Sequence, residues 1–255
     1  MDRRNFLKTG GIALLGSLAT GSAMALTTPG ALGGEGADKK AAVALAMNHF
    51  GVSEADLKKV LAAALEKGGD YADLFFEHTI TNSIRLMDGA VNNSYSNIDY
   101  GVGVRVLIGD QSGYAYVENI TVEDMLKAAR TAARIASANK GNKPLNLTEK
   151  ELKKNYYTVA SPWEEVSLKD KMPYLQKLND RIFALDKRVH KVQASQSDTT
   201  SHIFFCNSEG VMFYDYRPMV TLGAVCIMED NGKIENSYAS RAFRTGAEFL
   251  TDDII

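Results

Sequence analysis

The chain has 255 residues, of which 45% are hydrophobic and 24% are charged, and its formal net charge is −2. This is an ordinary globular composition, with room for one large domain or two small ones. No long run of like charge is present, so the charge balance argues against a dedicated nucleic-acid-binding protein.

Residues 1–25, "MDRRNFLKTGGIALLGSLATGSAMA", have the order of an export signal. A basic start precedes a short apolar stretch and small residues, and we expect cleavage after Ala25. The twin-arginine type is indicated by Arg3, Arg4, Phe6 and Leu7. The apolar stretch is too short to span a membrane, so no stable membrane span is expected. We therefore expect a periplasmic protein exported by the twin-arginine route. The alternative is a cytosolic protein with a chance basic and apolar start.

The leader carries a charge of +2, so the mature part would carry −4, which weakens a DNA-binding role further. Residues 26–39 are rich in Gly, Thr and Pro and are expected to form a flexible tether.

A domain over residues 40–255 is expected after the tether. An Ala-rich stretch ending at Phe50 predicts a short helix. Residues 53–67 predict a second helix, because Ser53 and Asp56 have capping-box spacing and apolar residues recur at helical spacing.

Residues 71–118 form a first block of predicted strands, rich in β-branched and aromatic residues. Asp88-Gly89 predicts a tight hairpin turn, and a second hairpin is expected around Asp110-Gln111. A helix capped by Thr121 follows, and residues 139–166 read as a long connection.

A further helix is predicted over residues 167–186, with a capping box at Ser167 and Asp170. Its expected buried face consists of Leu168, Met172, Leu175, Leu178, Ile182 and Leu185. Residues 189–243 then form a second strand block, with turns at residues 207–210 and at Asn231-Gly232.

The strands occur in blocks and do not alternate with helices one by one. We therefore predict an α+β fold in which antiparallel strand meanders pack with helices.

The stretch "YGVGVRVLIG" contains Gly101 and Gly103, which suggest a dinucleotide-binding loop. Such a loop lies between a strand and a helix and has a third glycine, whereas Val106 stands at that place and no helix follows. These glycines are therefore expected to mark a bulge or a close backbone approach within a strand.

The four histidines, His49, His78, His190 and His202, do not form a helical metal motif. His78 and His202 lie on different predicted strands and could meet in space; otherwise they are surface or packed residues. Glu77 and His78 are expected to point to opposite sides of a strand. Asp215 and Arg217 are expected to make a polar face or an ion pair. No nucleophile motif is present.

Cys206 and Cys226 lie in apolar strand-like runs. They are expected to be two buried thiols, with a disulfide as the alternative, because pairing geometry cannot be derived from sequence.

Residues 68–136 resemble the amino-terminal domain of the TldD/PmbA family. The resemblance rests on "DYADLFFEH", the "DGAV" turn, "GVGVRV", the "SGYAY" hairpin and "AARTAARIA", and "DLFFEH" is similar to the TldD branch. These proteins, once described as modulators of DNA gyrase, are understood as zinc metalloproteases. The resemblance implies a dimer around an enclosed site that admits extended or unfolded peptides. It also implies zinc held by a His-Glu-x-x-x-His motif and a later cysteine in the carboxy-terminal domain.

This chain contains no His-Glu-x-x-x-His motif, and neither of its cysteines matches the zinc cysteine. We therefore assign no catalytic or metal-binding residue and expect no cofactor in this chain. The chain is interpreted as the amino-terminal domain of an exported TldD-like zinc metalloprotease whose catalytic half is missing. It would contribute dimer contacts and a peptide channel. The alternative is a non-enzymatic binding subunit that pairs with a full-length family member.

Overall fold

The computed structural model describes residues 39–136, 147–149, 157 and 159–255. The predicted export-signal residues lie outside this part of the chain, as do nearly all of the tether and most of the 139–166 connection. The export-signal residues Arg3, Arg4, Phe6 and Leu7 and the cleavage site at Ala25 therefore stay predictions.

The described helices are α2 (Lys39–Phe50), α3 (Glu54–Leu65), α4 (Val122–Ile135) and α5 (Leu168–Leu185). Ser53 and Ser167 each head a capping box, with Asp56 and Asp170 as the acidic partners. Thr121 caps α4 by accepting a hydrogen bond from the amide of Asp124. The predicted helix starts are confirmed, because a side-chain acceptor satisfies amides that the first turn leaves unpaired.

The strands are β1 (Tyr71–Met87), β2 (Ala90–Ile108), β3 (Gln111–Val117), β4 (Thr148–Glu149), β5 (Val189–Asn207), β6 (Val211–Asp230) and β7 (Lys233–Phe243). They form one seven-stranded sheet in the order β3-β2-β1-β5-β6-β4, with β7 also paired to β6. The short β4–β6 pair is parallel and every other pair is antiparallel. The α+β prediction is therefore confirmed.

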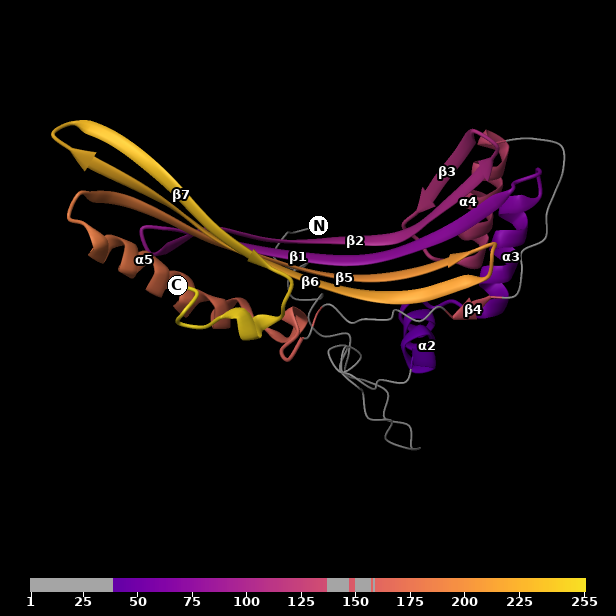
Figure 1. The fold of residues 1–255 in the computed structure, drawn as a ribbon, viewed down its shortest axis with the longest axis horizontal. Helices are drawn as coiled ribbons and strands as arrows, with labels where there is room; N and C mark the ends of the chain where they lie inside the picture. The colour runs from indigo at the N-terminus through magenta and orange to yellow at the C-terminus, as the bar shows by residue number, and fades with distance from the viewer. Residues whose placement is uncertain (1–38, 137–146, 150–156, 158) are drawn as a thin grey trace, which may run out of the picture.

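The two predicted strand blocks meet along the middle of this sheet. β1 from the first block pairs with β5 from the second, from Asp73 opposite Asn207 to Met87 opposite Gln193. The strands are long and bend together, as Figure 1 shows. Residues far apart in sequence are thereby placed side by side.

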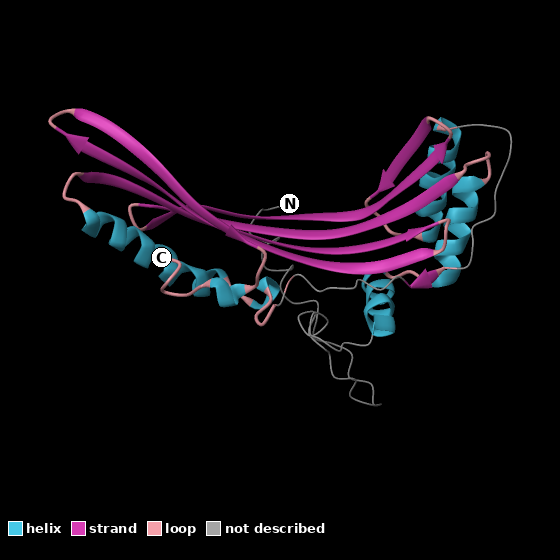
Figure 2. Cartoon of the chain, viewed as in Figure 1, coloured by secondary structure: helices cyan, strands magenta, loops and turns pink. Residues whose placement is uncertain are grey.

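Both hydrophobic clusters lie on one face of the sheet. The larger one packs α2, α3 and α4 against alternate strand residues such as Leu74, Phe76 and Val104. The smaller one packs α5 and the 3-10 helix η2 (Trp163–Glu165) against Ile84 and Leu86. α2 and α5 therefore lie under opposite halves of the same face (Figure 2). Part of this face of the sheet lies between α2 and α5.

Two hairpin turns at one end of the sheet have the same backbone form. Asp88 and Gly89 have φ values of 50° and 80°, and Asn231 and Gly232 have 51° and 79°. Positive φ at both central residues is typical of a type I′ turn, whose twist suits long paired strands. Both predicted turns are confirmed.

Gly101 and Gly103 lie inside β2, as expected for glycines at a close approach. A Cβ at Gly101 would lie 2.5 Å from the carbonyl oxygen of Val117, and one at Gly103 would lie 2.5 Å from the Tyr114 hydroxyl. The two glycines therefore make room for β3, and they head no nucleotide loop.

The predicted buried face of α5 is partly wrong. Leu168 is 43% exposed and Leu185 is 81% exposed. The fully buried residues are Lys171, Leu175 and Asn179, which lie one helical turn apart. A polar partner beneath the helix, described below, explains why Lys171 takes a core position.

Cys206 and Cys226 are both free, Cys206 being buried and Cys226 partly exposed. The two cysteines are not cross-strand partners: Cys206 lies opposite Met212, and Cys226 lies opposite Val192. Burial raises the pKa of the Cys206 thiol strongly, so it stays protonated. Among the described residues, no helix is long and apolar enough to cross a membrane.

Candidate functional site

Three histidines meet on the helix-bearing face between α2 and η2. His78 of β1 and His202 of β5 are direct cross-strand partners. His49, in the last turn of α2, lies over both: its ring centroid is 4.9 Å from that of His78 and 4.8 Å from that of His202. His49 Nε2 and His78 Nδ1 are 2.8 Å apart and share a hydrogen bond. The cluster joins three elements that are distant in sequence.

His202 is fixed by partners at both ring nitrogens. Its Nδ1 lies 2.7 Å from the Tyr214 hydroxyl, and its Nε2 lies 3.1 Å from a carboxylate oxygen of Glu164. Glu164 also accepts hydrogen bonds from Tyr216 and Thr200. These contacts hold one ring orientation, because a histidine with two engaged nitrogens cannot rotate without losing both.

Partial burial lowers the pKa of two of the three histidines, His49 and His78. The pKa of His49 is lowered to about 4, mainly by partial burial and also by the neighbouring His202 and His78, whose effects outweigh that of Glu164. Burial and His202 also hold the pKa of His78 below its ordinary value. At neutral pH both rings are therefore uncharged.

Glu164 is the anionic member of the cluster. Burial acts to raise its pKa, but the hydrogen bond and electrostatic attraction of His202, a backbone hydrogen bond and a hydrogen bond from Tyr216 outweigh burial, so the pKa lies below its ordinary value. Burial, with the Glu164 charge, raises the pKa of Tyr214 and Tyr216 strongly. The two tyrosines are therefore neutral donors beside an ionised carboxylate.

Next to Glu164 lies a pocket of about 460 Å³. Its walls combine strand residues such as Asn82 and Ser96 with Trp163, Lys171 and Asp198. Its volume is in the range of small-molecule and side-chain pockets. The pocket and the histidine cluster share Glu164 as a wall.

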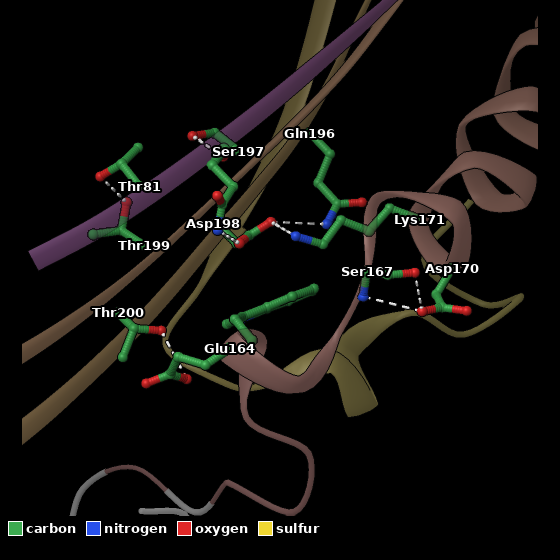
Figure 3. Close-up of polar contacts among 12 residues, drawn as sticks. Thr81, Glu164, Ser167, Asp170, Lys171, Gln196, Ser197, Asp198, Thr199 and Thr200 are labelled. Carbon is green, nitrogen blue, oxygen red and sulfur yellow. Dashed lines mark hydrogen bonds and ion pairs between the residues drawn. The ribbon is translucent and has the colours of Figure 1, made fainter. Parts of the chain in front are cut away.

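A buried ion pair forms part of the pocket lining. Lys171 Nζ lies 2.6 Å from Asp198 Oδ1, and the two side chains are only 3% and 2% exposed. Asn82 and Gln196 also donate to Asp198, and the Lys171 ammonium lies 5.3 Å from the Trp163 ring centre. Figure 3 shows Lys171 reaching from α5 toward Asp198 on the sheet, with Glu164 near Thr200.

The described residues do not fit a catalytic zinc site. Zinc requires several ligand nitrogens or carboxylates that converge on one point. Here His49 and His78 engage each other, His202 engages Tyr214 and Glu164, and His202 stacks face to face on His49. Within the described part of the chain, no group of three or more metal-ligating side chains is arranged to hold a metal.

β2 presents a long open edge beside the pocket. Its pairing with β3 covers only Val102–Ile108, so over Ala90–Gly101 it pairs with β1 alone among the described residues. Residues 90–100 are all exposed, including Val91, Tyr95 and Ile98. Such an edge offers unpaired backbone donors and acceptors to an extended chain.

The structure also shows where the other charged and histidine residues named in the sequence analysis lie. Arg217 and Asp215 form the predicted ion pair, with Nε 2.6 Å from a carboxylate oxygen. Glu77 bonds Thr79 on the opposite face from His78, as expected. His190 lies apart from the cluster, 3.7 Å from Glu229.

The sequence did not predict that His49, Glu164 and Lys171 would belong to this site. The available signal was weak. His49 stands beside Phe50 at the end of a short Ala-rich helix, and Glu164 lies in a polar connection.

Two family models match this chain. The PmbA/TldA metallopeptidase domain 1 matches residues 72–136, and the PmbA/TldA metallopeptidase central domain matches residues 161–255. Together they cover more than half of the chain, and the strands of both join in the one sheet.

Curated relatives agree with these matches. A metalloprotease TldD homologue from Haemophilus influenzae is 30% identical over 185 residues, which is 71% of this chain and 38% of that protein. A TldD homologue from Buchnera aphidicola is 27% identical over 204 residues, 80% of this chain and 42% of that protein. The chain therefore spans about two fifths of the length of the curated relatives it matches.

Solved structures share the fold. A candidate modulator of DNA gyrase from Thermotoga maritima has a TM-score of 0.60 at 20% identity, over 79% of this chain and 45% of that chain. A similar protein from Bacteroides thetaiotaomicron has a TM-score of 0.61 at 13% identity, over 75% of this chain and 45% of that chain.

Proposed function

Because the chain belongs to the PmbA/TldD metallopeptidase family, we propose that it forms the scaffold part of an exported TldD-like zinc metalloprotease. The observation that carries the proposal is the match of two successive family domains in a sequence that has no His-Glu-x-x-x-His motif. The zinc ligands and the general base would then come from outside these 255 residues. Zinc bound there would polarise the scissile carbonyl and activate water.

In this proposal the chain binds and orients an extended peptide. The open edge of β2 supports this role, because backbone pairing gives affinity with little dependence on sequence. The segment 90–101 contains one charged residue, Asp99, and no proline or lysine that would block pairing. The pocket beside it could receive a peptide side chain.

Contacts with a second subunit are the other proposed contribution. A dimer would enclose the peptide on this scaffold and keep folded proteins out. The related gyrase-modulator names suggest a DNA role as well. The expected charge of −4 on the mature part opposes it, because DNA affinity depends on basic contacts.

A second candidate function is a non-enzymatic binding subunit that pairs with a full-length family member. The missing zinc motif favours it equally. Co-purification of the tagged chain with a larger family member from the native cell extract would support this candidate. A monomer that nevertheless aggregates through exposed apolar surface would count against it.

The test of the scaffold role is peptide binding without cleavage. The probe is the acetylated, amidated hexapeptide Val-Thr-Val-Thr-Val-Thr carrying a fluorophore, mixed with the full 255-residue chain. We expect binding by fluorescence anisotropy and an intact peptide by mass spectrometry. Failure of the folded chain to bind the peptide would overturn the scaffold role.

A further inference from the structure

We propose that His49, His78 and His202 form an acid-sensitive clasp that holds α2 on the sheet and releases it when the cluster takes up protons. This inference goes beyond the proposed function and does not rest on it. It concerns how firmly the first described helix is held.

α2 packs on the sheet through buried Val43 and Ala46 and, most extensively, through its last turn. Phe50 is 2% exposed and contacts the rings of Phe76, Tyr100 and Phe204, with centroids 5.4, 6.0 and 6.4 Å away. His49, the preceding residue, supplies the polar half of the same contact through His78 and His202. A change at His49 therefore acts directly on the attachment of the helix.

Protonation opposes this contact in two ways. The hydrogen bond between His49 and His78 needs one ring nitrogen as an acceptor, and two protonated rings have only donors. The three ring centroids are also only 4.8 to 5.9 Å apart, so each added charge repels the next. Separation of α2 from the sheet relieves both effects.

The other ionisable groups that face His49 do not cancel the effect of its protonation. η2 contributes one carboxylate, which attracts protonated rings but is already bonded to His202. β2 and β6 contribute tyrosines whose pKa values are raised by burial, so they stay neutral in acid. α2 itself has lysines only in its first turn. The facing groups are Glu164, Tyr100, Tyr214, Tyr216, His78 and His202.

The direction of the pH effect follows from linkage. The folded-state pKa of His49 is about 4, below its ordinary value of 6.5, so the released helix binds more protons between these values. Attachment is complete above the ordinary value and is lost as the pH falls toward the folded value. From pH 7.5 to pH 5.0, the shift of His49 alone would raise the opening constant by at most about 30-fold. The ring of His49 is partly exposed, so solvent screens its interactions and the effect is expected to be nearer tenfold.

The experiment is hydrogen–deuterium exchange of the 255-residue chain at pH 7.5 and 5.0, corrected for intrinsic exchange rates. We expect the opening of amides 43–50 to increase about tenfold at pH 5.0. The amides of α5 (Leu168–Leu185) serve as the internal reference and should keep their protection. Equal protection of α2 at both pH values would overturn the proposal, and so would a parallel loss in α5.

Variants separate the histidine effect from a general acid effect. His49→Phe keeps an aromatic ring in place without a titrating nitrogen, and we expect its pH response to be less than about threefold. His49→Gln serves the same purpose if the phenylalanine variant does not fold. His190→Gln, at a histidine outside the cluster, is the matched control and should respond like the unaltered chain. An unaltered response in both His49 variants would contradict the clasp.

Discussion

Lys171 and Asp198 form an ion pair beneath α5 that is almost completely shielded from solvent. The Nζ–Oδ1 distance is 2.6 Å. Asn82 donates a hydrogen bond to the second carboxylate oxygen of Asp198. A buried charge is tolerated only where a partner and hydrogen bonds replace water, so this pair fixes how α5 sits on the sheet.

Removal of the buried cation is expected to destabilise the fold strongly. Lys171→Met leaves the Asp198 carboxylate buried without its counter-charge, and the expected loss is about 3–5 kcal/mol in the free energy of unfolding. The measurement is urea denaturation of the 255-residue chain. The matched control is Lys177→Met on the same helix, where an exposed pair with Asp252 should contribute less than about 1 kcal/mol. Similar losses in the two variants would contradict a structural role for the buried pair.

The glycines of β2 allow a graded test of the close approach of β3. Gly101→Ala places a methyl group against the backbone carbonyl of Val117, which cannot move without shifting the strand. We expect a loss of about 1–3 kcal/mol. Gly103→Ala meets the far end of the Tyr114 side chain, which is 57% exposed and can turn away. Thermal unfolding should rank Gly101→Ala as the less stable variant; the reverse order would refute this explanation.

Glu248 is expected to anchor the last described segment in a pH-dependent way. Burial acts to raise its pKa, but hydrogen bonds from Thr245 and from the amides of Ser161 and Gly246 outweigh it and lower the pKa. Its stabilisation is therefore complete above the ordinary value of 4.5 and is lost as the pH falls through the lower folded value.

Glu248→Gln should accordingly lower the free energy of unfolding at pH 7 by about 1–2 kcal/mol. The difference from the unaltered chain should shrink as the pH falls below 4.5. Urea denaturation at several pH values measures this. Glu235→Gln on the exposed strand β7 is the control. A difference that grows in acid would have the wrong sign and would exclude the mechanism.

The open edge of β2 gives a prediction for peptide binding. Ile98→Lys introduces a charge into the unpaired segment and should weaken binding of the Val-Thr hexapeptide about tenfold, which corresponds to about 1.4 kcal/mol. Leu185→Lys, at an 81% exposed position at the end of α5 and away from every sheet edge, is the matched control. A peptide N-methylated at alternate residues should also lose affinity, because it lacks the donors needed for pairing. Equal weakening by both lysine variants would indicate a nonspecific charge effect.

Local signals predicted the helices and turns well. The helix starts are predicted by Ser53, Thr121 and Ser167, and the hairpins by Asp88-Gly89 and Asn231-Gly232. Each of these signals acts over only a few neighbouring residues. The resemblance to the TldD/PmbA family also rested on such short stretches, and the family matches confirm it.

The candidate site could not be predicted in the same way. His49, His78 and His202 meet only because β1 pairs with β5 in one register and α2 packs over that pair. Helical periodicity identifies a buried face from its apolar residues, so it does not predict that Lys171 is buried. The burial of Lys171 depends on Asp198, which comes from a strand distant in sequence. Both features arise from tertiary pairing, which a single sequence does not encode locally.

The central claim is that these residues form a scaffold without the catalytic zinc. The direct measurement is the zinc content of the purified 255-residue chain, together with its hydrolysis of the fluorescent hexapeptide with and without EDTA. The account predicts far less than one zinc per chain and no hydrolysis that EDTA abolishes. Stoichiometric zinc with EDTA-sensitive hydrolysis by this chain alone would contradict it.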